Sequence, residues 1–334
     1  MNNISSNGIN SNSTSSSTSP PPLLFSGDAP QAAAARRDLF NSISPVYDEL
    51  NDRLSFGMHR VWKRMAVNWA LHGDGAMAAA AASASSSPGR RRAAPPPPPR
   101  RALDVCCGSG DLALLLADAL EAEWARRGSA PSSSSSSSIS APLEVVGLDF
   151  AADMLSDAAR RERRERRRPL VSAQAAAAAS RQQQQQLQPQ QQAPPRARIQ
   201  WVQGDAMRLP FPDASFGAAT VGYGLRNVAN PAAALRELAR VLAPGGHLAV
   251  LDFANARGAG DWLADAAQGA FLERLVVPEA EKYGMREQYA YLRPSVHAYP
   301  PGDELERMAA GAGFSYARHY PLAFGMMGCL VATR

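Results

Sequence analysis

The stretch Ala102-Leu-Asp-Val-Cys-Cys-Gly-Ser-Gly-Asp111, followed by an apolar run from Leu112 to Leu116, decides the fold of this chain. Residues 102–106 are apolar and partly β-branched, which predicts a short buried strand. Gly108-Ser109-Gly110 then predicts a tight turn into a helix. Glycine lets the backbone pass close beneath a ligand, and the first N–H groups of the following helix offer hydrogen bonds. We therefore expect this turn to bind a nucleotide-like molecule.

The same turn does not by itself say which molecule binds. Gly108, Gly110 and Ala113 satisfy G-x-G-x-x-G/A, which is the fingerprint of dinucleotide sites. A nicotinamide cofactor and S-adenosylmethionine are both compatible with it. Residues further along the chain have to distinguish the two.

Strands and helices alternate after this turn. Further strands are predicted over 143–150, 199–203, 216–223 and 247–253; helices are predicted at Met154–Leu155 and over 231–242. Such alternation indicates an α/β fold with a doubly wound parallel sheet. Its ligand is expected at the carboxyl ends of the strands, where Gly108, Asp149, Asp205 and Gly222 fall.

Two of these positions favour an adenosine-containing ligand. Asp149, at the end of the second strand, is placed to accept hydrogen bonds from both ribose hydroxyls, as in either candidate cofactor. Asp205 and Ala206 add a polar contact and an apolar surface for an adenine. This pair favours S-adenosylmethionine over NAD.

An N-terminal helical cap is predicted before the main fold. Leu39, Phe40, Ile43, Tyr47, Leu50 and Leu54 recur at helical spacing, and a second helix should carry Val61, Trp62, Met65 and Trp69. Polar side chains of this cap are candidates to face a substrate: Tyr47, Asp48, Asn51, Asp52 and His59.

Three low-complexity segments interrupt the expected domain, which spans 31–334. They lie at about 73–100, 128–140 and 160–195, and their composition predicts disordered inserts. The arginine run 160–168 holds seven arginines against two glutamates, which equals the whole net charge of +5. A solvated run without interleaved aromatics gives no support for a nucleic-acid partner.

The N-terminal segment and the cysteines indicate the cellular compartment. Residues 1–30 are rich in serine, threonine and asparagine, which is compatible with a plastid transit peptide or with plain disorder. Cys106, Cys107 and Cys329 form neither a disulfide framework nor a metal set, so we expect a reducing compartment and no metal. No apolar run is long enough to cross a bilayer.

Several motifs together resemble the ubiquinone/menaquinone biosynthesis C-methyltransferases. Beside the glycine turn, they are Leu54-Ser-Phe-Gly-Met-His-Arg-Val-Trp-Lys-Arg64, Gly147-Leu-Asp-Phe150, Gly204-Asp-Ala206, Leu209-Pro-Phe211, Gly222-Tyr-Gly-Leu-Arg-Asn-Val228, Arg240-Val-Leu-Ala-Pro-Gly245 and Leu251-Asp-Phe253. The resemblance implies a class I methyltransferase fold, Rossmann-like, with a seven-stranded, mostly parallel sheet. Bacterial relatives usually have Gly-Gly-Thr-Gly at the turn and a serine where Gly222 stands here.

The resemblance also implies a reaction and a set of site residues. The reaction is methyl transfer from S-adenosylmethionine to a ring carbon of a prenylated naphthoquinol, as in phylloquinone synthesis in a chloroplast. The alternative is a benzoquinol of the ubiquinone branch. Cofactor contacts are expected from Asp104, Gly108, Ser109, Gly110, Asp149, Asp205, Ala206 and Gly222.

Residues around the acceptor are expected to handle a developing charge. The ring carbon becomes nucleophilic when a neighbouring hydroxyl loses its proton, so a base or cation is needed near that oxygen. Arg226 is the candidate to stabilise the oxyanion, with Asn227 orienting it. His59 and Tyr47 are candidates to hold or deprotonate the hydroxyl. A structural pairing with a carboxylate is the alternative for Arg226.

Other functions and partners are weighed against these features. A dehydrogenase lacks a Tyr-x-x-x-Lys pair, because Lys63 and Lys282 are the only lysines; an RNA methyltransferase rests on the arginine run alone. A non-catalytic scaffold is disfavoured because both sets of motifs are intact. The segment 262–283 is expected to cover the isoprenoid tail near a membrane surface or to pack into the core. The sequence leaves the oligomeric state open.

Overall fold

The computed structural model describes residues 55, 57–75, 98–128, 142–181, 196–258, 260–286, 289 and 292–334 of this chain. The leader 1–30, the first predicted helix, and Tyr47, Asp48, Asn51 and Asp52 lie outside these ranges. So does most of the two low-complexity segments at 73–100 and 128–140.

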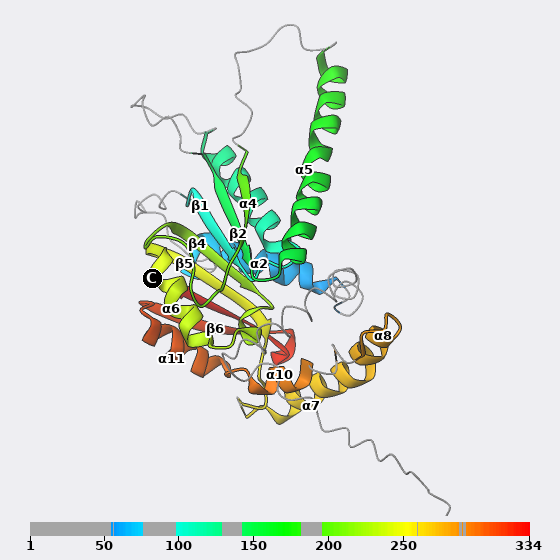
Figure 1. Ribbon diagram of the computed structural model, residues 1–334, viewed down its shortest axis with the longest axis vertical. Coiled ribbons are helices and arrows are strands. Elements are labelled where there is room, and N and C mark those ends of the chain that lie inside the picture. Colours follow the sequence, from blue (N-terminus) through cyan, green and yellow to red (C-terminus); the bar gives the residue numbers. More distant parts are fainter. Residues whose placement is uncertain are drawn as a thin grey trace, which may run out of the picture.

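The described residues form one seven-stranded sheet (Figure 1). Its strands are β1 Arg101–Val105, β2 Glu144–Asp149, β3 Arg198–Gln203, β4 Phe216–Gly222, β5 Leu242–Phe253, β6 Tyr316–Leu322 and β7 Met327–Thr333, in the order β3-β2-β1-β4-β5-β7-β6. β7 pairs antiparallel with β5 and with β6, and the other pairings are parallel. The predicted doubly wound, mostly parallel fold is confirmed, and all five strands located by sequence are present.

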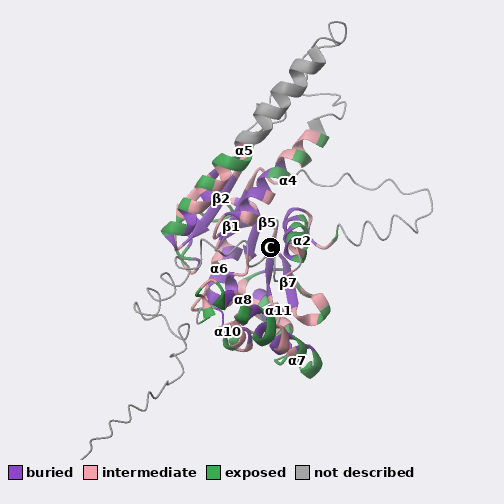
Figure 2. Cartoon of the chain, turned by 90° about the vertical axis from the view of Figure 1, so that its right-hand side faces the viewer, coloured by how far each residue is buried: buried purple, intermediate pink, exposed green. Residues whose placement is uncertain are grey.

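Helices cover both faces of the sheet. They are α2 Met58–His72, α4 Asp111–Gly128, α5 Ala152–Arg181, α6 Pro231–Val241, α7 Trp262–Phe271, α8 Val277–Glu281, α10 Leu292–Ala298 and α11 Gly302–Ala312. Side chains of α2 and α4 pack in one apolar core, and those of α6 and α11 pack in another. Alternate strand residues supply the two cores, as Ala102 and Leu103 do, because successive side chains point to opposite faces. Figure 2 shows the buried sheet between these layers.

The second predicted helix of the N-terminal cap is confirmed as α2. It ends at Gly73, whose φ of 65° suits glycine. A Cβ there would lie 2.8 Å from Cε1 of His247 on β5, so only glycine lets the chain pass this closely. Asp74 then accepts hydrogen bonds from the hydroxyls of Tyr316 and Tyr320 on β6. These contacts fix α2 against the sheet.

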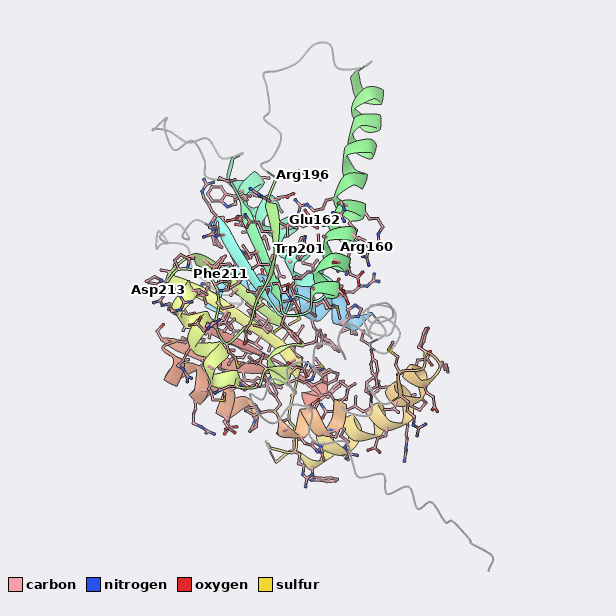
Figure 3. All side chains as sticks on the ribbon, in the orientation of Figure 1. Arg160, Glu162, Arg196, Trp201, Phe211 and Asp213 are labelled. Carbon is pink, nitrogen blue, oxygen red and sulfur yellow. The ribbon has the colours of Figure 1, made fainter. Side chains whose placement is uncertain are left out.

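The arginine run is ordered where we expected disorder. α5 continues through Arg181, and Arg161 pairs with Asp111 at the start of α4. Glu162 accepts a hydrogen bond from Nε1 of Trp201 at 2.9 Å, and Arg166 pairs with Glu121. Glu162 and Trp201 are labelled in Figure 3. The prediction of a disordered insert from residue 160 is wrong for 160–166. Arg161 and Glu162 lie about one helical turn before Arg166, so all three side chains face the domain. The amino-acid composition of the segment does not reveal this spacing.

The segment 262–283 packs partly into a core of its own. α7 continues into the π-helix η2 Leu272–Val276 and then α8. Leu272, Val276 and Ala280, four residues apart, are buried with Tyr289. Leu275 and Leu263 are exposed. None of the described helices has the length and apolarity needed to cross a membrane.

Candidate functional site

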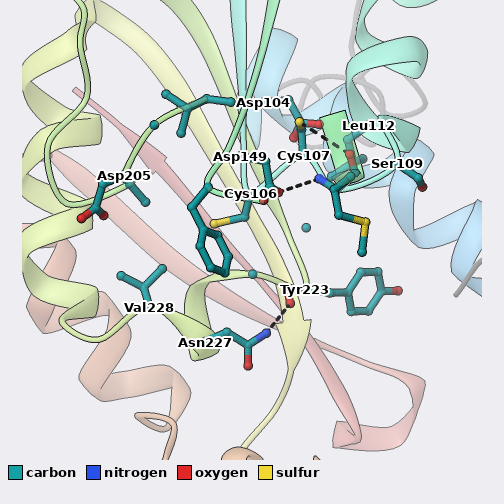
Figure 4. A pocket seen from close by; sticks show the side chains of 18 of the residues that line it. Asp104, Cys106, Cys107, Ser109, Leu112, Asp149, Asp205, Tyr223, Asn227 and Val228 are labelled. Atoms are coloured by element: carbon teal, nitrogen blue, oxygen red, sulfur yellow. Dashed lines mark hydrogen bonds between the residues drawn. The ribbon is translucent and has the colours of Figure 1, made fainter. Parts of the chain in front are cut away.

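A cavity of about 530 Å³ lies at the carboxyl ends of β1, β2 and β4 (Figure 4). Most of the residues expected to bind a cofactor line it: Asp104, Gly108, Ser109, Asp149, Asp205, Ala206 and Gly222. Asn227 also lines it, whereas Gly110, His59 and Arg226 are not among its lining residues. The fold therefore brings the dispersed motifs to one place, as the parallel sheet predicts.

The glycine turn has the backbone conformation that the sequence predicts. Gly108 and Gly110 have φ values of 52° and 87°. A Cβ on Gly110 would lie 2.6 Å from Cη2 of Trp201, so this glycine permits close packing beneath the turn. Gly108 has open space at the same position and faces the cavity. The two glycines thus have different roles.

Asp149 is held rigidly beside this turn. Its Oδ2 accepts from the Gly108 N–H at 2.8 Å, and its Oδ1 accepts from the Ala151 N–H at 3.0 Å. Burial raises the pKa of Asp149, and the backbone hydrogen bonds oppose that rise. Each carboxylate oxygen can accept more than one hydrogen bond, so Asp149 keeps acceptor capacity for a ribose.

Asp104 presents a buried acceptor to the cavity. Its Oδ1 accepts from Oγ1 of Thr220 at 2.8 Å, while Oδ2 has no hydrogen-bond partner among the described residues. Burial raises the pKa of Asp104 to about 7. An unsatisfied buried oxygen is costly, so it indicates a missing donor. The ammonium of a bound amino acid group fits this requirement.

Asp205 lies across the cavity from Tyr223 (Figure 4), and Ala206, the next residue, also lines the cavity. Asp205 is exposed, and its Oδ1 accepts from the Met207 N–H at 2.9 Å. Ala206 is buried. One polar edge beside an apolar surface suits an adenine. Together with Asp104, Asp149 and the Gly108 turn, this donor and acceptor set fits S-adenosylmethionine.

Gly222 lines the cavity but leaves no room for a side chain. A Cβ on Gly222 would lie 2.5 Å from Cδ1 of Leu112. A serine at this position would therefore require Leu112 to move. Glycine has no side chain, so Gly222 can contact a ligand only through its backbone.

Arg226, which the sequence predicts to act on the substrate oxygen, is not among the described residues that line the cavity. Its guanidinium pairs with Asp252 and donates to the Tyr223 carbonyl at 3.0 Å, and its side chain is 7% exposed. Asn227 donates to the same carbonyl at 3.2 Å and does line the cavity. Arg226 is thus paired with a carboxylate, which is the alternative that the sequence left open. This pairing forms because the 3-10 turn η1 Leu225–Asn227 directs residue 226 inward and toward β5.

His59 also differs from its expected position. Its Nδ1 lies 2.7 Å from Oγ of Ser55, one turn earlier in the chain, and the ring is buried. This pairing braces the start of α2 and does not place the imidazole in the cavity lining. Tyr47, the remaining candidate, lies outside the described residues.

Sequence reasoning missed Lys63. It is 4% exposed, lines the cavity and forms an ion pair with Asp111. A signal was present, because Lys63 shares the buried face of α2 with Ala66, Val67 and Ala70. A lysine in the apolar stripe of a helix requires a partner.

Comparison with known proteins gives one consistent family. The model of the ubiE/COQ5 methyltransferase family matches residues 31–185 and 176–334. The 2-phytyl-1,4-beta-naphthoquinone methyltransferase, chloroplastic, of Arabidopsis thaliana is 36% identical over 90% of this chain and 87% of its own. The 2-phytyl-1,4-naphtoquinone methyltransferase of Nostoc punctiforme is 38% identical over 89% and 97%.

Solved structures show more distant likenesses. A SAM-dependent methyltransferase from Thermotoga maritima, described as a possible histamine N-methyltransferase, is 14% identical with a TM-score of 0.45. The match covers 89% of this chain and 99% of that chain.

Proposed function

This chain belongs to the ubiE/COQ5 methyltransferase family, and we propose on that premise that it methylates a ring carbon of 2-phytyl-1,4-naphthoquinol with S-adenosylmethionine. The observation that carries the cofactor assignment is the cavity in which Asp104, Asp149 and the Gly108 turn converge. The assignment of a naphthoquinol as the substrate rests on the names of relatives that are similar over nearly their whole length.

The chain's own residues would hold the cofactor in three places. Asp149 accepts from the ribose, Ala206 contacts the adenine, and Oδ2 of Asp104 accepts from the ammonium. When bound, S-adenosylmethionine supplies an electrophilic methyl group on a sulfonium. The cavity aligns the acceptor carbon with that group and limits water, and such alignment accounts for a large part of the acceleration in group transfer.

The acceptor side of the cavity is built around the turn after β4. Tyr223, which has a φ of 57°, and Asn227 line this region. We assign to Arg226 the role of a positioning residue that fixes this turn through Asp252 and the Tyr223 carbonyl. Tyr47 and His59 are candidates for contact with the quinol hydroxyl on sequence grounds alone, since Tyr47 lies outside the described residues and His59 is not among the residues that line the cavity.

The test is methyl transfer from labelled S-adenosylmethionine to reduced 2-phytyl-naphthoquinone and to a polyprenyl benzoquinol lacking its methyl group. We expect the naphthoquinol to be methylated faster. Preference for the benzoquinol would assign the chain to ubiquinone synthesis. Calorimetric binding of S-adenosylmethionine without transfer to either acceptor would support a cofactor-binding scaffold, and binding of NAD would contradict the assignment.

We also propose a chloroplast location and contact with a lipid surface. The location rests on the relative named chloroplastic and on the leader 1–30, which has serine and threonine in plenty and a single acidic residue, Asp28. Import of a fluorescent protein fused to residues 1–60 by isolated chloroplasts tests it; exclusion from the organelle contradicts it. Contact with a lipid surface rests on the exposed apolar side chains of Trp262, Leu263 and Phe324.

A further inference from the structure

Most of the charged side chains that line the cavity are acidic. Its lining includes four carboxylates, those of Asp104, Asp111, Asp149 and Asp205. Among the described lining residues, Lys63 is the one cationic side chain. S-adenosylmethionine carries an ammonium and a sulfonium, but its amino acid end also carries a carboxylate. That carboxylate needs a cation or N–H donors in a region that otherwise favours positive charge.

Lys63 can bind a second acceptor although it is paired. Its Nζ contacts Oδ2 of Asp111, while Nη1 of Arg161 contacts Oδ1 of the same carboxylate. Burial tends to raise the pKa of Asp111, but Lys63 and Arg161 lower it overall, so the carboxylate is ionised. Asp111 thus contacts two cations, and Arg161 also pairs with Glu165 at 2.8 Å, so Lys63 is not the sole counter-ion of Asp111. An ammonium also has three donors, so it can bind Asp111 and a second acceptor together.

The position of Lys63 identifies which part of the ligand it meets. Asp111 begins α4 directly after the glycine turn, and Nζ of Lys63 lies 5.7 Å from the centroid of the Tyr223 ring. Figure 4 shows Tyr223 across the cavity from Asp205, which is the adenine side. Lys63 therefore lies at the end of the cavity where the amino acid group extends.

We propose that Lys63 binds the carboxylate of the cofactor's amino acid group and that Asp111 and Arg161 hold the lysine in place for this contact. The inference rests on the proposed function, because it requires an S-adenosylmethionine site. It makes α2 part of the cofactor site.

The test compares two ligands that differ only in this carboxylate. S-adenosylhomocysteine and its decarboxylated analogue are titrated by calorimetry into the wild-type full chain, Lys63→Met and Lys63→Arg. Loss of a hydrogen-bonded charge typically changes affinity by about 10- to 100-fold. We expect Lys63→Met to lose this much affinity for S-adenosylhomocysteine and less than about threefold for the analogue. Lys63→Arg, which retains the charge, should lose less.

The matched control is Lys282→Met, which removes the other lysine. Lys282 is exposed, directly follows α8 and pairs with Glu279, so its loss should leave both affinities unchanged. The inference is overturned if Lys63→Met loses affinity equally for both ligands or loses affinity for neither. Unchanged cofactor affinity with slower methylation would instead place Lys63 on the quinol oxygen. Failure of the wild-type chain to bind either ligand contradicts the proposed function itself.

A second measurement needs no variant and does not depend on its folding. Because the chain has two lysines, acylation by an amine-selective reagent can be followed at each by mass spectrometry. S-adenosylhomocysteine should slow modification of Lys63 more than the decarboxylated analogue does, with Lys282 as the internal reference. Equal protection by the two ligands also overturns the inference.

Discussion

Single buried carboxylates set the chemistry of the cavity at the residue scale. Asp104 is 1% exposed and has one oxygen paired with Thr220 on the adjacent strand β4. Its other oxygen faces the site. A carboxyl group in this setting is neutral or ionised according to small changes of pH, so ligand binding and protonation are linked.

Cofactor affinity should therefore depend on pH near neutrality. The pKa of Asp104 is about 7 in the folded chain, and only the ionised form pairs with an ammonium. Between pH 6 and pH 8 the ionised fraction rises about tenfold, and affinity for S-adenosylhomocysteine should rise with it. Calorimetry across this range tests the prediction, with Asp104→Asn as a control that should show a flat profile. A slope that persists in Asp104→Asn would assign the effect to another group.

The same raised pKa has a consequence for folding. A carboxyl group that is easier to protonate in the folded state stabilises it most below the unfolded pKa of 3.8. This contribution is lost as pH rises from about 4 through 7. A bound cofactor reverses the trend, because its ammonium favours the ionised carboxylate.

Gly222 and Leu112 should behave as a coupled pair. Gly222→Ala introduces a methyl group 2.5 Å from Cδ1 of Leu112, and such overpacking costs about 1–3 kcal/mol. In a Leu112→Ala background the added methyl has room, so the cost should shrink. Denaturant unfolding and ligand titration of the two single variants and the double variant measure the coupling. Strict additivity would show that the two side chains do not compete for space.

At the scale of elements, a short turn connects the cavity to the sheet. Asp252, on β5, accepts from the backbone N–H of Arg226 at 3.2 Å and pairs with its guanidinium. Asn227 donates its N–H to the Gly224 carbonyl at 2.9 Å. These contacts hold η1 against β5 and orient the residues that line the cavity.

Removal of Arg226 should affect both stability and turnover. Arg226→Ala leaves the buried Asp252 carboxylate without its ion-pair partner, which costs about 3–5 kcal/mol. Misplacement of the turn should lower kcat by about two powers of ten, with cofactor Kd nearly unchanged. Arg226→Lys keeps the charge without the planar fork, so it should recover most of the stability and only part of kcat. Full activity in the folded Arg226→Ala variant would show that Arg226 does not act as a positioning residue for this turn.

α5 contains a supporting part and a dispensable part. Deletion of 171–192 keeps Arg161, Glu162 and Arg166, and Arg196 already reaches the Arg166 carbonyl at 2.6 Å. This deletion should change Tm by less than about 2 °C because closing a loop of different length costs little. Deletion of 161–192 removes all three contacts and should lower Tm by several degrees and weaken cofactor binding through Asp111. Equal melting of the two deletions would contradict this division.

At the scale of the whole molecule, two segments far apart in the sequence lie in contact, and each carries exposed apolar side chains. Phe324, in the turn between β6 and β7, is 99% exposed, and Trp262 and Leu263 at the start of α7 are 76% and 64% exposed. A Cβ on Gly325 would lie 3.5 Å from Cβ of Ala264, so the two segments are in contact. Phe324 has a φ of 57°, an unfavourable conformation for an aromatic residue. An exposed cluster of this kind is typical of contact with an interface.

This surface should bind lipid. We expect the chain to co-sediment with phosphatidylcholine and phosphatidylglycerol vesicles, and the triple variant Trp262→Ser, Leu263→Ser, Phe324→Ser to bind at least about tenfold more weakly. Val61→Ser, at a 43% exposed apolar position on α2, is the control and should bind like the wild type. The rate of methyl transfer to a short-chain quinol should be unaffected in the triple variant. Equal sedimentation of all variants would locate the lipid contact elsewhere.

The fold class and most of the residues that line the cavity follow from the sequence pattern. Local patterns suffice for both, because the glycine turn, Asp149 and Asp205-Ala206 each follow a strand, and the ends of parallel strands meet at one edge. The partners of Lys63, Arg226 and the arginine run, in contrast, became known only from the tertiary structure. Each of these depends on a partner far away in the chain: Asp111 for Lys63 and Arg161, Asp252 for Arg226, and Trp201 for Glu162. A charged residue looks the same in a sequence whether water or a buried counter-ion surrounds it, and only packing settles which of the two it meets.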